Sequence, residues 1–155
     1  MAQGPNILVI GIGNEYRCDD GVGRALARAL YPMSDRVRVI EESGEGAALM
    51  EAWRGADTVI LIDAVHSGGP PGTIYRFDAR AQQIPQNFFR YSTHAFSLAE
   101  AVELARTLGQ LPPTLIIYGI EGGNFEAGTE LSPEVTQASG EVLQSIRGEI
   151  GKELN

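Results

Sequence analysis

Cysteine is almost absent from this sequence: Cys18 stands alone in 155 residues, so no internal disulfide bond can form. A chain of this length can bury one substantial hydrophobic core without such cross-links. We therefore expect a single domain over residues 1–155. The polar tail after about residue 148 is expected to fray.

Positive charge is also scarce, with 12 Lys and Arg against 20 Asp and Glu and a net charge of −8 at pH 7. The resulting field repels nucleic acids and anionic lipids and favours cations or basic peptides. We therefore expect neither a nucleic-acid nor a membrane partner.

Long apolar runs are missing as well, and none of those present could span a bilayer. The first residues, MAQGPN, do not combine a basic region with an apolar stretch as a secretory signal does. The sequence predicts a cytoplasmic protein. Because no pattern in it indicates a dimer interface, we expect a monomer.

Short, nearly continuous apolar runs are present, and they are typical of strands covered on both faces. They occupy residues 7–12, 58–65 and 114–120. Two further strands are predicted, an alternating one at 36–41 and a short one at 73–77 after a Gly/Pro-rich loop.

Apolar residues at helical spacing predict helices between these strands. The predicted helices cover residues 22–30, 48–53, 98–108 and a last one from Pro133, with Ser132 as its N-cap. The order β-α-β-α-β-β-α-β-α predicts an α/β protein with an open sheet between two helical layers. In such sheets, ligands bind beyond the carboxyl ends of the strands.

The loop after the first strand, GIGNEYRCDDGVG at residues 11–23, resembles the start of a nucleotide-binding unit. Tyr16, however, stands where the dinucleotide pattern needs its third glycine, and no Gly-Lys-Ser/Thr motif occurs. Asp19 and Asp20 occupy the helix start where a phosphate would bind. The loop therefore favours a cation over a phosphate.

Two aspartates are candidates for that cation site. Asp63 ends the buried run TVILID at the carboxyl end of a central strand, where a carboxylate is costly unless paired or bound. Asp20 should lie at the same edge of the sheet, on the neighbouring strand's loop. As alternatives, Asp20 could cap the following helix and Asp63 could accept backbone N–H groups from the next turn.

Of the two histidines, His94 in YSTHAFSLAEA precedes a long amphipathic helix that could cover the same edge. A capping or structural role is its alternative. Together, Asp20, Asp63 and His94 would form an open set of ligands for a divalent transition metal. His66, in the loop DAVHSGGPPG, is predicted to be a solvent-exposed turn residue.

Other candidate residues are less favoured. Cys18 could act as a nucleophile with His94 as its base, but the adjacent acids disfavour a thiolate. Glu41 and Glu121 follow strands and could line the rim of the site, although solvated loop acids are the favoured interpretation. No G-x-S-x-G nucleophile motif is present.

Four segments in this order resemble the hydrogenase maturation proteases, and the resemblance covers residues 6 to 148. The segments are GIGNEYRCDDGVG, VILIDAVHSGGPPGTIYRFD, STHAFSLAEAVELAR and YGIEGGNFEAGTELSPEV. The resemblance implies a three-layer α/β/α sandwich of the phosphorylase/hydrolase-like kind. Its mostly parallel five-stranded sheet would have the order 2-1-3-5-4, and TIYRF is the candidate for an antiparallel edge strand.

The resemblance also implies an activity. Members of the family are endopeptidases, often grouped with the aspartic type, that cut a C-terminal extension from the nickel–iron hydrogenase large-subunit precursor after nickel insertion. Their metal-contacting positions fall here on Asp20, Asp63 and His94. Nickel is expected in the substrate rather than permanently held, and zinc or cadmium could replace it in crystals.

This sequence departs from the family at two places. The turn after the second strand reads EESGEG, where several members have an aspartate followed by glycines, so Glu41 would hold the acidic position. Cys18 stands where the family commonly has a small or polar residue.

Two other functions remain open: a metallopeptidase or amidohydrolase that carries its own metal, and a non-catalytic nickel-checking chaperone of the same partner. The sequence also leaves open whether the metal or a carboxylate activates the attacking water.

Overall fold

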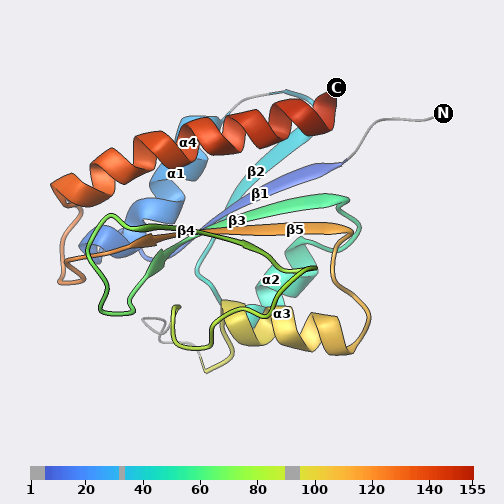
Figure 1. Ribbon diagram of the computed structural model, residues 1–155, viewed down its shortest axis with the longest axis horizontal. Coiled ribbons are helices and arrows are strands. Elements are labelled where there is room, and N and C mark those ends of the chain that lie inside the picture. The colour runs from blue at the N-terminus through green and yellow to red at the C-terminus, as the bar shows by residue number, and fades with distance from the viewer. Residues whose placement is uncertain (1–5, 32–33, 90–94) are drawn as a thin grey trace.

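The computed structural model describes residues 6–31, 34–89 and 95–155 and contains one five-stranded sheet. Its strands lie in the order β2-β1-β3-β5-β4 (Figure 1). Their bounds are β1 Ile7–Ile12, β2 Val37–Glu42, β3 Thr58–Val65, β4 Ile74–Asp78 and β5 Thr114–Glu121. Only β4 is antiparallel to its neighbour. The predicted strand order and the antiparallel edge strand are confirmed.

Helices cover both faces of this sheet and complete the three layers (Figure 1). One face carries α1 (Val22–Leu30) and α4 (Pro133–Leu154), and the other carries α2 (Gly46–Ala52) and α3 (Leu98–Thr107). A short 3₁₀ helix, η1 (Cys18–Gly21), leads into α1. None of the helices in the described ranges is both long and apolar enough to cross a membrane.

The continuous apolar runs contribute side chains to two hydrophobic cores, one on each face of the sheet. In β1, Leu8 and Ile10 belong to the cluster under α2 and α3, whereas Ile7 and Val9 belong to the cluster under α1 and α4. Successive side chains of a strand point to opposite faces, so a strand covered on both faces needs apolar residues at every position.

The C-terminal helix is longer than the sequence analysis expected. Residues after Gly148 continue α4 to Leu154 instead of fraying, and Ile150 is fully buried. Val142, Ile146 and Ile150 follow one another at i, i+4 spacing, so they form one stripe against the sheet. The expected frayed tail is wrong because this stripe extends past Gly148.

Candidate active site

The carboxyl ends of the four parallel strands meet at one edge of the sheet, and a small pocket lies there. Its volume of about 20 Å³ is room for one water molecule or one ion. Its lining residues come from the end of β1 and the loop after it, the loop after β2, η1, β3, Phe89 and the start of α3: Ile12, Gly13, Asp20, Ser43, Gly44, Asp63, Ala64, Phe89, Ser97 and Leu98.

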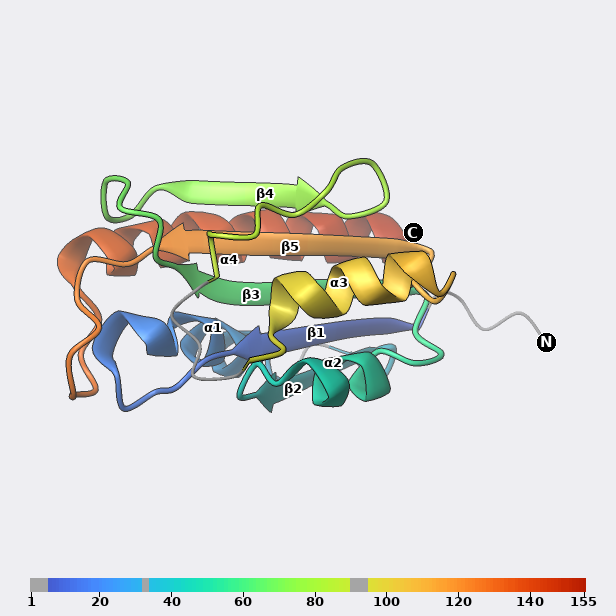
Figure 2. The ribbon, with the colours of Figure 1, turned by 90° about the horizontal axis from the view of Figure 1, so that it is seen from below.

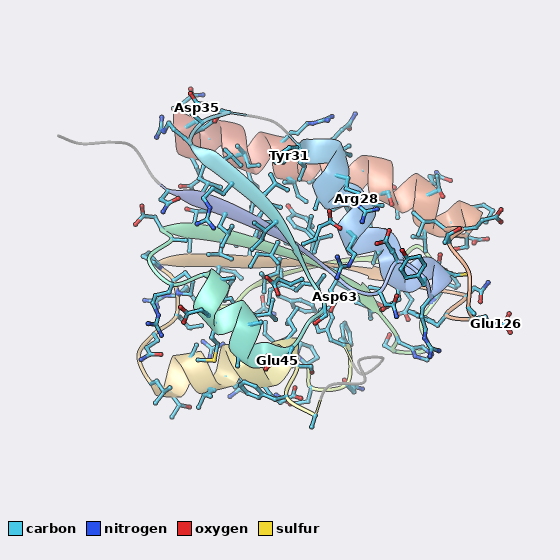
Figure 3. All side chains as sticks on the ribbon, turned by 180° about the vertical axis from the view of Figure 1, so that it is seen from behind. Arg28, Tyr31, Asp35, Glu45, Asp63 and Glu126 are labelled. Atoms are coloured by element: carbon cyan, nitrogen blue, oxygen red, sulfur yellow. The ribbon has the colours of Figure 1, made fainter. Side chains whose placement is uncertain are left out.

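Asp63 lies in the wall of this pocket, within β3 and two residues before the strand ends (Figure 3). It is 8% exposed, and its Oδ1 accepts a hydrogen bond of 2.8 Å from the backbone N–H of Ala64. Burial raises the pKa of Asp63 well above its usual value, and the negative charge of Asp20 raises it further. This bond comes from the next residue of β3 rather than from the turn that the sequence analysis expected to supply it, and it does not offset the burial.

Asp20 lines the same pocket from η1. The helix cap of α1 is Gly21, without a side-chain cap bond, so the alternative role of Asp20 as an N-cap is wrong. Its Oδ2 instead accepts a hydrogen bond of 2.8 Å from Asn14 N–H. Burial raises the pKa of Asp20, although this bond and the charges of Arg17 and Arg24 oppose the change.

Glycines allow α1 to approach the sheet closely enough to bring the two aspartates together. A Cβ at Gly23 would lie 2.3 Å from the carbonyl oxygen of Ile62 and 2.4 Å from that of Ile12. Gly13 has φ +139°, and a Cβ there would lie 2.0 Å from the carbonyl oxygen of Asp20. Gly23 thus provides the close helix–sheet packing that the sequence pattern failed to provide at Tyr16.

Asp19 does not join Asp20 in the pocket, which corrects the expectation that both carboxylates occupy the helix start. Its side chain is fully buried and accepts four hydrogen bonds. The donors are the backbone N–H groups of Gly123, Asn124 and Ser132 and the hydroxyl of Ser132. This role could not be predicted from the sequence, because the donors lie more than a hundred positions away.

His94, the third predicted ligand, lies outside the described residues. Phe89 and Ser97, on either side of residues 90–94 in the sequence, both line the pocket. Within residues 6–31, 34–89 and 95–155, no group of three His, Cys, Asp or Glu side chains could hold a metal ion. His66 is exposed, as predicted, and its ring lies 4.5 Å from that of Phe125.

Glu121 is not the solvated loop acid that the sequence suggested. It is 1% exposed at the end of β5 and accepts hydrogen bonds from Ser67 N–H, from the Ser67 hydroxyl and from the Tyr75 hydroxyl. Glu121 therefore ties the loop after β3 to the end of β5 and does not line the pocket.

Glu41 is also held by partners rather than solvated. It lies within β2 and pairs with Arg28 at 2.8 Å and with Arg24 at 3.3 Å. The hydrogen bonds from these two guanidinium groups hold the pKa of Glu41 below its usual value. Arg24 also donates to the carbonyl of Gly13, so the pairs brace the loop after β1.

Cys18 lies beside this site but does not line the pocket. It is buried, and its backbone N–H donates to the carbonyl of Gly128 at 2.9 Å. Its Sγ packs so closely on Gly128 that a Cβ there would lie 2.9 Å from the sulfur.

Asp20 and Asp63 therefore supply the pocket with the oxygen atoms of two carboxyl groups. These oxygen atoms can bind a cation or accept a proton from water.

Comparison with known proteins gives a family for this chain. A family model described as hydrogenase maturation protease matches residues 21–149, a range that includes Asp63 and His94. The hydrogenase expression/formation protein HupD of Thiocapsa roseopersicina is 32% identical over 143 residues, which cover 88% of this chain and 64% of that protein. The hydrogenase 2 maturation protease of Escherichia coli K12 is 28% identical over 145 residues, covering 90% and 87%.

The chain spans about 60–64% of the length of the first three curated relatives that it matches. Solved structures match over nearly the whole chain. The hydrogenase maturating endopeptidase HybD of E. coli aligns with a TM-score of 0.79 at 25% identity, over 95% of this chain and 93% of that one. Another E. coli endopeptidase aligns with a TM-score of 0.78 at 27% identity, over 91% and 89%. The chain therefore belongs to the hydrogenase maturation protease family.

Proposed function

We propose that this chain is an endopeptidase that removes the C-terminal extension of a nickel–iron hydrogenase large-subunit precursor after nickel insertion. The observation that carries the proposal is the meeting of Asp20 and Asp63 in one small pocket at the carboxyl edge of the sheet. The names of the relatives, which are maturation proteases and a maturating endopeptidase, support the substrate class. The enzyme would act as a monomer in the cytoplasm.

In this proposal the nickel is part of the substrate. Two carboxylates in one small pocket repel each other, and each is penalised by burial, so a divalent cation between them compensates both charges. His94 would be the third ligand, and three protein ligands leave positions for groups of the precursor. The described residues on both sides of residues 90–94 line the pocket, which supports keeping His94 in this set.

The reaction is the hydrolysis of one peptide bond. A water molecule attacks the scissile carbonyl, and one carboxylate of the pair takes its proton as a general base. The same proton then goes to the departing amine as the carbon–nitrogen bond breaks. The substrate's metal, held beside the carbonyl, would stabilise the negative charge that develops on the carbonyl oxygen. This chemistry corresponds to a nickel-dependent peptidase of the aspartic type.

The test is to incubate the purified protein with nickel-loaded precursor and to measure the mass of the large subunit. Wild type should release the extension, whereas Asp63→Asn and Asp20→Asn should process the precursor at least about 100-fold more slowly. Asp35→Asn is the matched control, because Asp35 is exposed and lies well away from Asp63 (Figure 3). Circular dichroism should give the same fold for all four proteins.

Other outcomes would point to the alternative functions. Binding of the precursor by wild type without any shortened product would indicate a chaperone. Stoichiometric zinc or nickel in the substrate-free protein would indicate a metallopeptidase with its own metal. Full processing by Asp63→Asn would contradict the role proposed for the carboxylate pair.

A further inference from the structure

Two loops that are far apart in the sequence are joined beside the pocket. The loop after β1 pairs with the loop after β5 through an isolated parallel bridge between Arg17 and Gly128. Backbone hydrogen bonds of 2.9 Å run from Cys18 N–H to the Gly128 carbonyl and from Gly128 N–H to the Tyr16 carbonyl. Figure 2 shows these loops together at the end of the molecule where β5 and β1 terminate.

Asp19 is the residue on which this junction is centred. Its backbone N–H donates to the Asn124 carbonyl at 2.9 Å, and its buried carboxylate receives four hydrogen bonds of 2.7–2.9 Å from Gly123, Asn124 and Ser132. Bonds to a charged acceptor are shorter and stronger than those between neutral groups. A fully buried carboxylate requires such partners, so the loop 122–132 is held firmly at this point.

The same residue is the direct neighbour of Asp20 within η1. This helix has only four residues, and it begins at Cys18 with φ 46°, a left-handed conformation that is unfavourable for a residue with a side chain. Contacts around η1 must therefore keep the turn in place. Two backbone bonds, from Cys18 N–H to Gly128 and from Asp19 N–H to Asn124, join η1 to loop 122–132. The four bonds to the Asp19 carboxylate are the side-chain contacts that add to them.

We propose that Asp19 is a positioning residue: by fastening η1 to loop 122–132, it holds Asp20 where it shares the pocket with Asp63. The inference rests on the proposed function of that pocket. Asp19 touches neither the cation nor the substrate, because its carboxylate faces loop 122–132 and is fully buried. Its effect on the reaction passes through the position of Asp20.

The test uses Asp19→Asn in the full chain. An amide offers one oxygen instead of two, and its NH₂ group cannot accept from the surrounding N–H groups, so bonds from Gly123, Asn124 or Ser132 are lost. Hydrogen exchange should become faster in residues 122–132 and also in residues 19–22. The affinity for Cd²⁺ alone, measured by calorimetry, should fall by about 10-fold, and kcat by about 10- to 100-fold with a nearly unchanged KM.

Three further variants separate positioning from stability. Ser132→Ala removes one of the four donors and should give a smaller loss of the same kind. Val142 is a buried core residue of α4. Val142→Ala should lower Tm without changing Cd²⁺ affinity or kcat at temperatures where the protein is folded. Asp35→Asn removes an exposed charge at the other end of the molecule from this loop (Figure 3) and should leave all three readouts unchanged.

Two results would overturn the inference: unchanged exchange of residues 19–22 in Asp19→Asn, or Cd²⁺ affinity and kcat no lower than in Val142→Ala. Failure of wild type to shorten the precursor would contradict the proposed function instead. In that case the exchange of residues 19–22 still decides whether Asp19 holds η1.

Discussion

At the scale of single residues, the pocket is built from carboxyl groups whose charged form is penalised. The pKa of Asp63 is raised, first by burial and then by the charge of Asp20. Below the usual pKa of about 3.9, Asp63 is protonated in both the folded and the unfolded chain, so no penalty exists. As the pH rises, the unfolded chain loses its proton first, and the free energy of unfolding falls until the folded pKa is passed.

We therefore expect Asp63→Asn to be more stable than wild type at pH 7.5 in the absence of metal. The gain should be about 1.4 kcal/mol for each unit by which the folded pKa is raised, and it should disappear near pH 3. Thermal and urea unfolding between pH 3 and 8, with a chelator present, measure it. If Asp63→Asn were less stable than wild type at pH 7.5, the negative charge of Asp63 would have to be stabilised by its surroundings in the folded protein.

The residue scale also shows what the sequence could predict. The positions of Asp20 and Asp63 at the pocket followed from strand ends, because parallel strands place their carboxyl ends at one edge. The roles of Asp19 and Glu121 did not follow, because their partners lie 104–113 and 46–54 residues away. Local patterns give no information on such partners. His94 stays a prediction.

At the scale of secondary-structure elements, the pocket depends on how closely α1 packs on β1 and β3. Gly23→Ala should displace α1, since its Cβ would meet the backbone carbonyl oxygens of Ile62 and Ile12, which cannot move aside easily. We expect a loss of about 2–4 kcal/mol in the free energy of unfolding and about 100-fold slower processing, because Asp20 moves with the helix.

Gly140→Ala is the matched control for that substitution. Gly140 lies in α4, and a Cβ there would meet nothing within 4 Å apart from the neighbouring backbone of its own helix. The same chemical change should therefore stabilise the protein by about 0.5–1 kcal/mol through helix propensity. Urea unfolding and precursor cleavage of both variants give the comparison. If Gly23→Ala were as stable and as active as Gly140→Ala, α1 would tolerate a larger separation from the sheet.

The end of α4 provides another prediction at this scale. Ile150→Ala should lower the free energy of unfolding by about 2–4 kcal/mol, because Ile150 is fully buried against the sheet. The end of this helix could not be predicted from the sequence, because Gly148 and Gly151, poor helix formers, interrupt the last turns. A change below about 0.5 kcal/mol in chemical denaturation would instead agree with the frayed tail.

At the scale of the whole molecule, the α/β class followed from the sequence because apolar runs alternate with helical patterns. The order of the strands was implied by the family resemblance, since a hydrophobic run predicts a strand but not its neighbours. The distribution of charge is visible in the sequence: no Lys or Arg occurs between residues 107 and 146. This range includes the loop 122–132 beside the pocket, with exposed Glu126 and Glu130.

This negative loop should attract the cation-bearing face of the precursor. Glu126→Lys should lower kcat/KM by about 2- to 5-fold at low ionic strength and leave kcat unchanged, because it weakens the attraction before contact. Asp35→Lys makes the same charge change at the opposite end of the molecule (Figure 3) and should have a smaller effect.

Ionic strength makes the comparison decisive. Above about 0.5 M salt the Debye length is only a few ångströms, so kcat/KM of Glu126→Lys should approach that of wild type. Kinetics at several salt concentrations test this for both variants. Equal losses for Glu126→Lys and Asp35→Lys would mean that net charge matters and its position does not. A loss that persists at high salt would mean that Glu126 makes a direct contact with the precursor.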